Sequence, residues 1–412
     1  MGPRPKRRRL TDPTEDLDDQ EICQPASQLE KDRWNGFCEI ESEPALFNVM
    51  LRDFGVKGVK IQEVVSLDEE MMAFLDKPVL GLIFLFRWRE DDAEKQEATC
   101  PDGIWFANQT ASNACASVAL LNIVNNIPNI DLGENLRHFK DFTMQFTPAL
   151  RGNAIDNFEF VKRVHNSFAR KMDILNSDLQ LQWDTKSKKK RSNGQDENDS
   201  DSGFHFIAFM PAMGQVWKFD GLERQPQSLG ECSDSDDWLR LARPNILDRM
   251  AAYEEEQIEF SILGLVRDPL PDLIQQLAVN VRSLKVVHDR LTSHAGPTAQ
   301  VEAARTSASS GLEETVTGPE PSFGLTRMAI DEAMITKASD QAYRTCSPTE
   351  LQSHQEDLRQ AQRELRERIR EAQQTQRADD DHATGRRYDY GPAIRTWLRF
   401  LARKQLLAEL LQ

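Results

Sequence analysis

The sequence has no apolar run long enough to span a bilayer, which takes roughly 18 consecutive residues. Its longest apolar segment, PVLGLIFLFRW at 78–88, is interrupted by Arg87 and is typical of a buried strand. The basic segment MGPRPKRRRL is not followed by an apolar stretch, so it lacks the pattern of a secretory signal. We therefore expect a protein with no membrane partner and no secretory leader.

Cysteine is scarce, and its spacing is irregular. The six cysteines of the 412-residue chain include no CxxC pair. Such pairs are typical of zinc sites, whereas dense cysteines are typical of disulfide-stapled secreted domains. The sequence therefore predicts neither a metal centre nor a disulfide framework, and no organic cofactor is implied. It indicates a reducing compartment, in which a thiol stays free to react.

Positive charge is also in deficit, because 51 lysines and arginines stand against 67 aspartates and glutamates, a net charge of −16. Proteins that bind nucleic acids usually carry a basic surface, so this balance argues against nucleic acid as a partner. Two local basic runs, PRPKRRRL and KSKKKR at 186–191, are candidate nuclear import signals. We therefore expect the protein in both the cytoplasm and the nucleus.

The succession of polar and apolar segments divides the chain into parts. Residues 1–32 are charged and poor in large apolar groups, so we expect a disordered arm. Apolar positions with helical and strand spacing begin near Trp34 and continue, without a regular βαβ repeat, to about residue 268. This mixture predicts one α+β domain over residues 33–268.

Within this domain the spacing of apolar residues predicts individual helices and strands. Helices are expected at 44–54, 111–127, 134–147 and 157–172. Strands are expected at 61–65, 79–88, 103–108 and 258–266, and a hairpin at 204–220. The charge-segregated stretch 183–202 predicts a solvated loop.

The remainder of the chain is predicted to be a helical extension. A helix is expected at 269–294, a linker rich in glycine, serine, threonine and proline at 295–322, and further helices over 323–412. The charged helix at 347–375 is expected to be followed by a break at 379–385. The last segment carries an apolar stripe that is too large for a free tail, so we expect it to dock on a partner. The stripe consists of Ile394, Trp397, Leu398, Leu401, Leu406 and Leu407.

Cys115 lies in the first turn of the helix expected at 111–127, where Ser112 or Asn113 is the expected cap. Free backbone N–H groups and the helix dipole stabilise a thiolate at this position and lower the pKa of the thiol. The thiolate is the nucleophilic form, and a nearby histidine would activate it further. The simpler interpretation is a small buried core residue, since free cysteine is among the most buried residue types.

Three polar residues complete a catalytic pattern around Cys115. Gln109 follows the strand expected at 103–108, from where its amide can donate to the carbonyl oxygen that the thiolate attacks. His205 and Asp220 lie on the two strands of the predicted hairpin, where cross-strand Cβ atoms are about 4.5–5.5 Å apart. A carboxylate there can orient the imidazole, as in other triads.

Each of these residues also has a structural interpretation when taken alone. Gln109 could cap a turn, and His205 could be a strand residue whose ring is hydrogen-bonded to a neighbour. Asp220 could end a strand at the turn that contains Gly221. The combination of all four indicates a cysteine nucleophile with a histidine base.

These segments resemble the ubiquitin C-terminal hydrolase family of cysteine proteases. The resemblance covers residues 34 to about 268, through segments that include WNGFCEIESEPALFNVMLRDFGV, NQTASNACASVALLNIV, VHNSFAR, FHFIAFMP and WKFDGL. It implies an α+β, papain-like fold with an antiparallel sheet sandwiched between helices. It also implies Cys115 as nucleophile, His205 as general base and acid, Asp220 as the residue that orients His205, and Gln109 as oxyanion donor.

The implied activity is that of a thiol-dependent ubiquitin hydrolase. Such an enzyme cleaves ester, thioester, amide or isopeptide bonds at the C-terminal glycine of ubiquitin, in ubiquitin-dependent protein catabolism. By family position, a loop that crosses over the active site is expected near 150–158, and ubiquitin is expected to contact 40–44 and 253–257.

The C-terminal extension resembles that of the long branch of this family, through YDYGPAIRTWLRFLARKQLLAELL. The resemblance implies that these helices dock an adaptor, either a proteasomal ubiquitin receptor or a chromatin-associated partner. Three alternatives remain at this point. The first is an inactive ubiquitin-binding scaffold that docks to the proteasome or chromatin through its C-terminal helices. The second is a non-enzymatic adaptor with a vestigial site. The third is an unrelated papain-like protease.

Overall fold

The structure is a computed structural model that describes residues 26–87, 96–177, 204–233, 237–254, 260–294, 315–388 and 390–403. Most of the predicted arm, the loop expected at 183–202, both basic runs, and the linker up to residue 314 lie outside the described residues. The chain divides into two compact units. The first comprises Met1–Val266 together with Asp379–Gln412, and the second comprises Arg267–Ala378.

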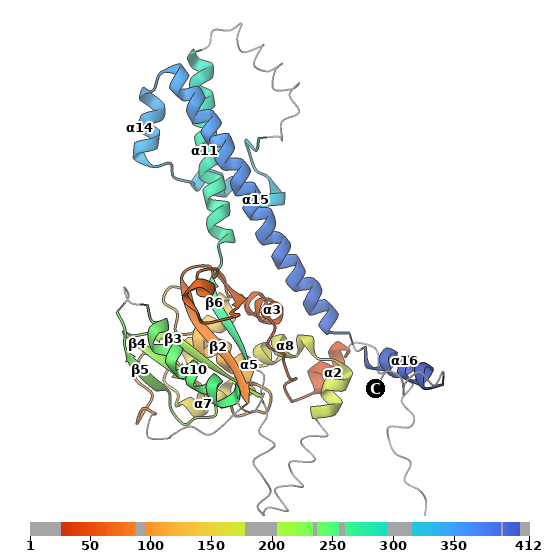
Figure 1. Ribbon diagram of the computed structural model, residues 1–412. Coiled ribbons are helices and arrows are strands. Elements are labelled where there is room, and N and C mark those ends of the chain that lie inside the picture. Colours follow the sequence, from red (N-terminus) through yellow and green to blue (C-terminus); the bar gives the residue numbers. More distant parts are fainter. Residues whose placement is uncertain are drawn as a thin grey trace, which may run out of the picture. The chain divides into compact units, whose positions relative to one another are not determined.

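A six-stranded sheet forms the centre of the first unit, with the strand order β1-β6-β2-β3-β4-β5 (Figure 1). The pairs β6–β2, β2–β3, β3–β4 and β4–β5 are antiparallel. The strands are β1 (Val59–Glu63), β2 (Val79–Arg87), β3 (Phe204–Ala212), β4 (Gln215–Phe219), β5 (Gln227–Glu231) and β6 (Ser261–Arg267). The predicted central strand, the hairpin and the strand before residue 268 are thereby confirmed.

Helices cover both faces of this sheet. The first unit contains α2 (Gln28–Arg33), α3 (Pro44–Phe54), α4 (Glu69–Met72), α5 (Cys115–Val124), α6 (Gly133–Thr143), α7 (Pro148–Asp156), α8 (Glu159–His165), the 3₁₀ helix η2 (Asn166–Phe168), α10 (Leu239–Glu254) and α16 (Gly391–Arg403). One core cluster joins α3, α5, α6 and α8 to the sheet, and a second joins α4 and α10 to its other face. The predicted α+β fold, with an antiparallel sheet sandwiched between helices, is confirmed.

Strand β2 shows why the sheet lies at the centre. Ile83 belongs to the first core cluster, whereas its neighbours Leu82 and Phe84 belong to the second. All three side chains are fully buried. A strand that is apolar on both faces has to lie inside a layered fold, because either face would otherwise expose apolar area to water.

The strand predicted at 103–108 is wrong. This extended segment pairs with two asparagines at the end of α5 instead of with another strand. Asn122 accepts from the backbone N–H of Ala107 at 2.8 Å and donates to its carbonyl at 3.2 Å. Asn126 likewise accepts from the backbone N–H of Trp105 at 2.8 Å and donates to its carbonyl at 2.7 Å. The side-chain amides thus supply the donors and acceptors that a neighbouring strand normally provides.

The loop conformation expected at 150–158 is also wrong, because most of this stretch is helix α7. Thr147 caps the helix, with its side chain accepting from the backbone N–H of Leu150, and Pro148 occupies the first turn. The buried Arg151 donates to the carbonyls of Ile104 and Phe106, at 3.2 and 3.1 Å. A side chain with these buried partners holds the segment in one conformation.

The expected disordered arm ends earlier than predicted, because residues 28–32 lie in helix α2. Ser27 and Glu30 form a reciprocal capping box at its start. Lys31 donates to the carbonyl of Ser167 at 2.6 Å, which ties the helix to η2. The apolar content of this segment was too small to signal such polar anchoring.

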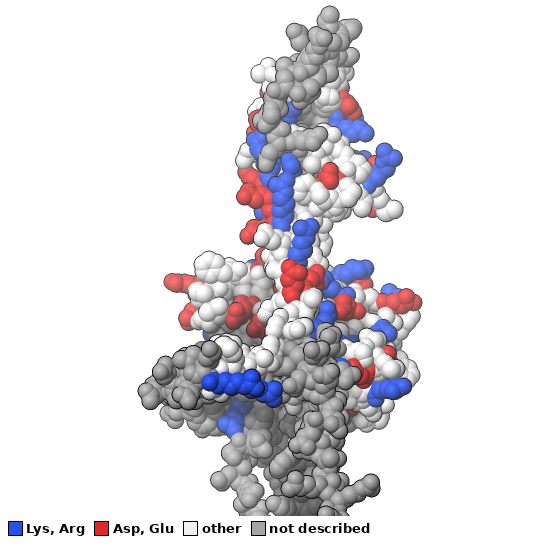
Figure 2. Space-filling view, turned by 90° about the vertical axis from the view of Figure 1, so that its right-hand side faces the viewer, with Lys and Arg blue, Asp and Glu red and all other residues white. Residues whose placement is uncertain are grey.

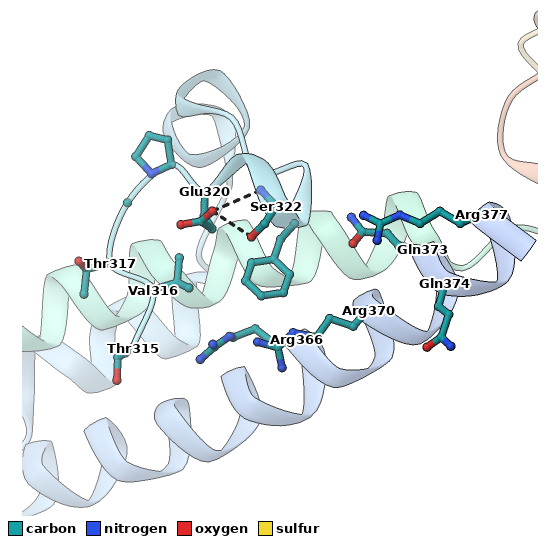
Figure 3. A pocket seen from close by; sticks show the side chains of 13 residues that line it. Thr315, Val316, Thr317, Glu320, Ser322, Arg366, Arg370, Gln373, Gln374 and Arg377 are labelled. Atoms are coloured by element: carbon teal, nitrogen blue, oxygen red, sulfur yellow. Dashed lines mark hydrogen bonds between the residues drawn. The ribbon is translucent and has the colours of Figure 1, made fainter. Parts of the chain in front are cut away.

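The second unit is helical. It contains α11 (Leu270–His294), η3 (Pro321–Phe323), α13 (Arg327–Glu332), α14 (Lys337–Thr345) and the greater part of α15 (Pro348–Arg386). Leu277 of α11, Phe323 of η3 and Ile369 of α15 meet in its core. A cavity of about 820 Å³ lies between the 315–323 segment and α15, and Arg366, Arg370 and Arg377 point toward it (Figure 3).

The predicted break at 379–385 is wrong, because α15 continues through this stretch to Arg386. Its last turns belong to the first unit. Asn48 donates to the Asp379 carboxylate at 3.1 Å, and Ala383 is 1% exposed within the first core cluster. Tertiary contacts therefore hold a glycine-containing, polar segment in a helix that local propensity disfavours.

We expect Asn122→Ala to destabilise the first unit. The substitution leaves the buried N–H and carbonyl of Ala107 without their side-chain partner, and each orphaned group costs about 1–3 kcal/mol. The free energy of unfolding, measured by urea denaturation, should fall by about 2–6 kcal/mol. Asn135→Ala, at an exposed position on α6, is the control and should change it by less than about 0.5 kcal/mol. Equal small losses in both variants would contradict this account of the 103–108 segment.

Candidate active site

Cys115 is the first residue of α5 and is half-buried. The helix has no side-chain cap: its N-cap residue is Ala114, and Asn113 before it adopts a positive φ of 61°. The caps expected at Ser112 or Asn113 are therefore wrong. Cys115 therefore begins the helix directly, at the positive end of the α5 dipole.

His205 and Asp220 form a buried pair. The Nε2 atom of His205 lies 2.7 Å from Oδ1 of Asp220, and their side chains are 4% and 2% exposed. Ala208 of β3 pairs with Phe219, the last residue of β4, so Asp220 reaches His205 diagonally from just past the strand end. The backbone N–H of Leu222 also donates to Oδ1 of Asp220, at 3.0 Å.

This environment keeps His205 protonated. Burial by itself lowers the pKa of His205, but the hydrogen bonds and charges of Asp220 and Cys115 outweigh it and raise the pKa to about 9. Burial by itself raises the pKa of Asp220, and the bond to His205 outweighs it, so the pKa is lowered. With Nε2 bound to Asp220, the other ring nitrogen, Nδ1, is left for Cys115. The arrangement favours a protonated imidazole beside Cys115 at neutral pH.

Gln109 is hydrogen-bonded to the turn that contains Asp220 and Gly221. Its backbone N–H donates to the carbonyl of Gly221 at 2.8 Å, and its side-chain Nε2 donates to the carbonyl of Ala111 at 3.1 Å. Gly221 permits this approach, because a Cβ there would lie 3.1 Å from Gln109 and from Val118 of α5. The second Nε2 proton of Gln109 is left for another acceptor.

Helix α7 supports the segment that carries Gln109. The backbone N–H of Asn108 donates to the carbonyl of Pro148 at 3.0 Å, and its side chain donates to the carbonyl of Glu223 at 2.6 Å. A Cβ at Gly152 would lie 2.2 Å from the carbonyl oxygen of Asn108. Only glycine allows α7 to lie this close to the Gln109 segment.

Two buried titratable residues near the site were missed from the sequence. Lys218 of β4 is 2% exposed, and burial together with Arg249 lowers its pKa to about 8, although Asp220 and Glu223 oppose this. His165 at the end of α8 is fully buried, and burial lowers its pKa to about 4. A lysine between aromatic residues in WKFDG and a histidine in VHNSFAR were the available signals.

The geometry suits acyl transfer by a cysteine nucleophile. The sulfur, the imidazole and the carboxylate come from α5, β3 and the turn after β4, so the sheet and one helix bring together three residues that are separated in sequence. Within the described part of the chain, no three His, Cys, Asp or Glu side chains are grouped to hold a metal ion. No described helix is both long and apolar enough to cross a membrane.

The chain is similar to known proteins over most of its first unit. Residues 37–251 match the family model described as ubiquitin carboxyl-terminal hydrolase, family 1. The chain is 36% identical over 264 residues to ubiquitin carboxyl-terminal hydrolase isozyme L5 of Dictyostelium discoideum, which covers 63% of this chain and 71% of that protein. It is 31% identical over 249 residues to ubiquitin carboxyl-terminal hydrolase BAP1 of Gallus gallus, which covers 57% of this chain and 33% of that protein.

One similar solved structure is the UCH37 catalytic domain of Trichinella spiralis bound to ubiquitin vinyl methyl ester. The identity is 32% and the TM-score 0.46, with 57% of this chain and 96% of that chain covered.

We expect Asp220→Asn to lower the pKa of His205. The substitution keeps the shape of the side chain and removes a charge that favours the imidazolium, so the pKa should fall from about 9 toward its ordinary value. Histidine ring signals followed by NMR against pH measure this change directly. His138, an exposed residue of α6, is the internal control and should titrate alike in both proteins. An unchanged titration of His205 would show that Asp220 does not set its charge.

Proposed function

Because the chain belongs to family 1 of the ubiquitin carboxyl-terminal hydrolases, we propose that Cys115, His205, Asp220 and Gln109 carry out its reaction. The chain is a deubiquitinating cysteine hydrolase, which cleaves bonds to the C-terminal glycine of ubiquitin. Its activity requires a nucleophile, a proton donor and a stabiliser of negative charge. The residues described above supply one of each.

In the first half of the reaction, the Cys115 thiolate attacks the carbonyl carbon of ubiquitin's last glycine. The carbonyl oxygen takes up negative charge, and the side-chain amide of Gln109 and the backbone N–H of Cys115 donate to it. An oxyanion donor of this kind is worth about 10²–10³ in turnover. His205 then donates its proton to the leaving amine, and a thioester between Cys115 and ubiquitin remains.

In the second half, water attacks the thioester, and neutral His205 accepts its proton. The Cys115 thiolate leaves, and ubiquitin is released with a free carboxylate. Asp220 stabilises the imidazolium in the resting enzyme and fixes the ring, because it accepts from Nε2 at 2.7 Å. No step requires a metal ion or an organic cofactor.

One observation carries the assignment: Cys115 at the start of α5 interacts with the same buried imidazole that Asp220 holds. The alternative of an inactive ubiquitin-binding scaffold is not favoured. It would leave unexplained why a buried charged pair, which costs free energy to desolvate, stands beside an available thiol.

Ubiquitin is the macromolecular partner, and we propose that its basic tail meets local glutamates. Within the expected contact at 40–44, Glu41 and Glu43 are exposed, whereas Ile40 is buried. On the face shown in Figure 2, acidic and basic side chains are interspersed, so the net charge of −16 is not gathered there into one acidic patch. The second expected contact, at 253–257, lies largely outside the described residues.

We also propose that α16 docks an adaptor protein, either a proteasomal ubiquitin receptor or a chromatin-associated partner. Ile394 and Trp397 of α16 are 53% and 59% exposed, and Leu398 beside them is 42% exposed. Large apolar side chains grouped on one exposed helix are typical of a protein-binding surface.

The basic runs before residue 10 and at 186–191 support access to the nucleus as well as the cytoplasm.

We expect Cys115→Ala to abolish hydrolysis of a fluorogenic amide at the C-terminus of ubiquitin. Loss of the nucleophile should lower turnover by at least about 10³-fold, while the dissociation constant for ubiquitin, measured by calorimetry, stays close to that of the wild type. Cys346→Ala, which removes a half-buried thiol of the second unit, is the matched control and should keep full turnover. Turnover retained in Cys115→Ala would assign the chemistry to another residue.

We expect the double variant Ile394→Ser/Trp397→Ser to lose the adaptor without losing activity. Both substitutions remove apolar area from α16 and leave α15 and the Cys115 site unaltered. Affinity purification from cells should recover less proteasomal or chromatin-associated adaptor, while hydrolysis of the reporter by the isolated enzyme is unchanged. Met328→Ser, at a methionine of α13 that is 68% exposed, controls for a general loss of surface apolarity. Undiminished recovery of the adaptor would exclude α16 as its docking site.

A further inference from the structure

Arg386, the last residue of α15, is held by an unusual number of partners. Its side chain is 7% exposed and lies between two carboxylates, with Nε 2.9 Å from Glu41 and Nη1 2.5 Å from Asp173. The same guanidinium donates to the carbonyls of Phe168 and Glu39, each at 3.0 Å. A planar fork of five N–H donors can satisfy such a set at once, which a lysine cannot.

Neighbouring residues fasten the same end of α15. Arg387 donates to the carbonyl of Ser167 at 3.1 Å, and its guanidinium lies 5.4 Å from the ring centroid of Phe168. Asp380 forms an ion pair with Arg52 of α3. The helix end thus contacts α3, η2 and the 39–41 segment, all within the first unit.

The 37–39 segment also reaches the nucleophile's helix through His165. The Nε2 atom of His165 lies 2.8 Å from the carbonyl oxygen of Cys38, and its Nδ1 lies 2.8 Å from Oγ of Ser117. A carbonyl oxygen only accepts, so Nε2 carries the hydrogen and Ser117 donates to Nδ1. Burial lowers the pKa of His165 to about 4, which keeps this neutral tautomer at physiological pH.

Ser117 lies in the first turn of α5, two residues after Cys115. A second bond comes from the other side of the nucleophile, where Asn113 donates to the carbonyl of Phe37 at 3.3 Å. The 37–39 segment is therefore bonded, directly at Asn113 and through His165 at Ser117, to residues on both sides of Cys115. It is also bonded to Arg386 through the carbonyl of Glu39.

We infer that Arg386 is a positioning residue for Cys115, and that the C-terminal extension thereby completes the catalytic unit. Arg386 acts by holding Glu39 and Glu41. The adjoining Phe37 and Cys38 are in turn bonded to Asn113 and to His165, and His165 is bonded to Ser117 of α5. The inference rests on the proposed role of Cys115 as nucleophile. It gives the extension a part in the chemical step that is separate from adaptor docking by α16.

Loss of Arg386 should loosen this arrangement without unfolding the protein. Asp173 keeps a second partner, because Arg170 lies 2.8 Å from its carboxylate. Glu41 is 47% exposed and can be hydrated. A displacement of about 1 Å at a reacting group costs about 10²-fold in rate, so partial loosening of the first turn should lower kcat by about fivefold to tenfold. The KM for the ubiquitin reporter should stay within about twofold.

The experiment is a double-mutant cycle on the full chain, with Arg386→Ala and Ser117→Ala as the single variants. If both residues act through the same chain of contacts, the double variant should lose no more kcat than the worse single variant. Arg386→Lys should recover less than half of the loss, since one ammonium cannot bridge Glu41, Asp173 and two carbonyls. Multiplicative losses in the double variant, or full recovery in Arg386→Lys, would overturn the inference.

Arg368→Ala, at an exposed arginine of the same helix, is the matched control and should keep wild-type kcat. If Arg386→Ala does not fold, Glu41→Gln replaces it in the cycle, because it removes one partner of Arg386 at an exposed position. Glu41→Gln should lower kcat by about twofold to threefold. The double variant of Glu41→Gln and Ser117→Ala should lose no more kcat than the worse of the two single variants. Wild-type kcat in Glu41→Gln would then overturn the inference.

Alkylation of Cys115 by iodoacetamide, followed by mass spectrometry, separates this inference from the proposed function. Rapid alkylation in the wild type with slower alkylation in Arg386→Ala supports both the role of Cys115 as nucleophile and the positioning role of Arg386. Rapid alkylation and equal kcat in the two proteins would overturn the role of Arg386 and leave Cys115 as nucleophile. Slow alkylation in the wild type, together with turnover in Cys115→Ala, would overturn the proposed nucleophile and the inference with it.

Discussion

The burial of α5 against the sheet is the constraint on which the rest of the structure depends. Every residue from Ala116 to Val124 is buried, so the helix is surrounded on all sides and cannot rotate or slide without losing apolar contacts. A polar side chain on such a helix needs a specific partner. Ser117 finds His165, and Asn122 finds the backbone of Ala107. The same bonds that satisfy these groups also fix Cys115 relative to the 37–39 segment and to Gln109.

Two histidines show how the surroundings decide the charge of one residue type. His165 and His205 are both buried, and burial alone lowers the pKa of each. The hydrogen bonds and charges of Asp220 and Cys115 raise the pKa of His205, whereas the His165 ring is hydrogen-bonded, among the described residues, to a carbonyl and a hydroxyl. The first is suited to move a proton and the second to hold a position. Neither property follows from the residue type or from burial alone.

Helix α15 belongs to both compact units, so the order of the chain and the order of the structure differ. Its body packs with α11 and η3 in the second unit, and its last turns pack with α3 and η2 in the first. Helix α16 begins at Gly391, shortly after Arg386. A partner that binds α16 would therefore bind a helix that directly follows, along the chain, the residues that hold the 39–41 segment. The extension is better described as an insertion of the second unit into the catalytic one.

The sequence by itself determined the features that depend on local patterns: the twice-buried strand β2, the hairpin of β3 and β4, helix α3 between Pro44 and Gly55, and the candidate residues Gln109, Cys115, His205 and Asp220 in their order. Only the tertiary structure decided which groups meet. It replaced the strand expected at 103–108 by a segment bonded to Asn122, the expected loop at 150–158 by α7, and the expected break at 379–385 by the end of α15. It also brought His165 against Ser117 of α5, and Arg386 against the 39–41 segment. The reason is that periodicity specifies which face of a segment is buried, whereas buried polar groups choose partners by proximity in the folded chain, which no local pattern contains.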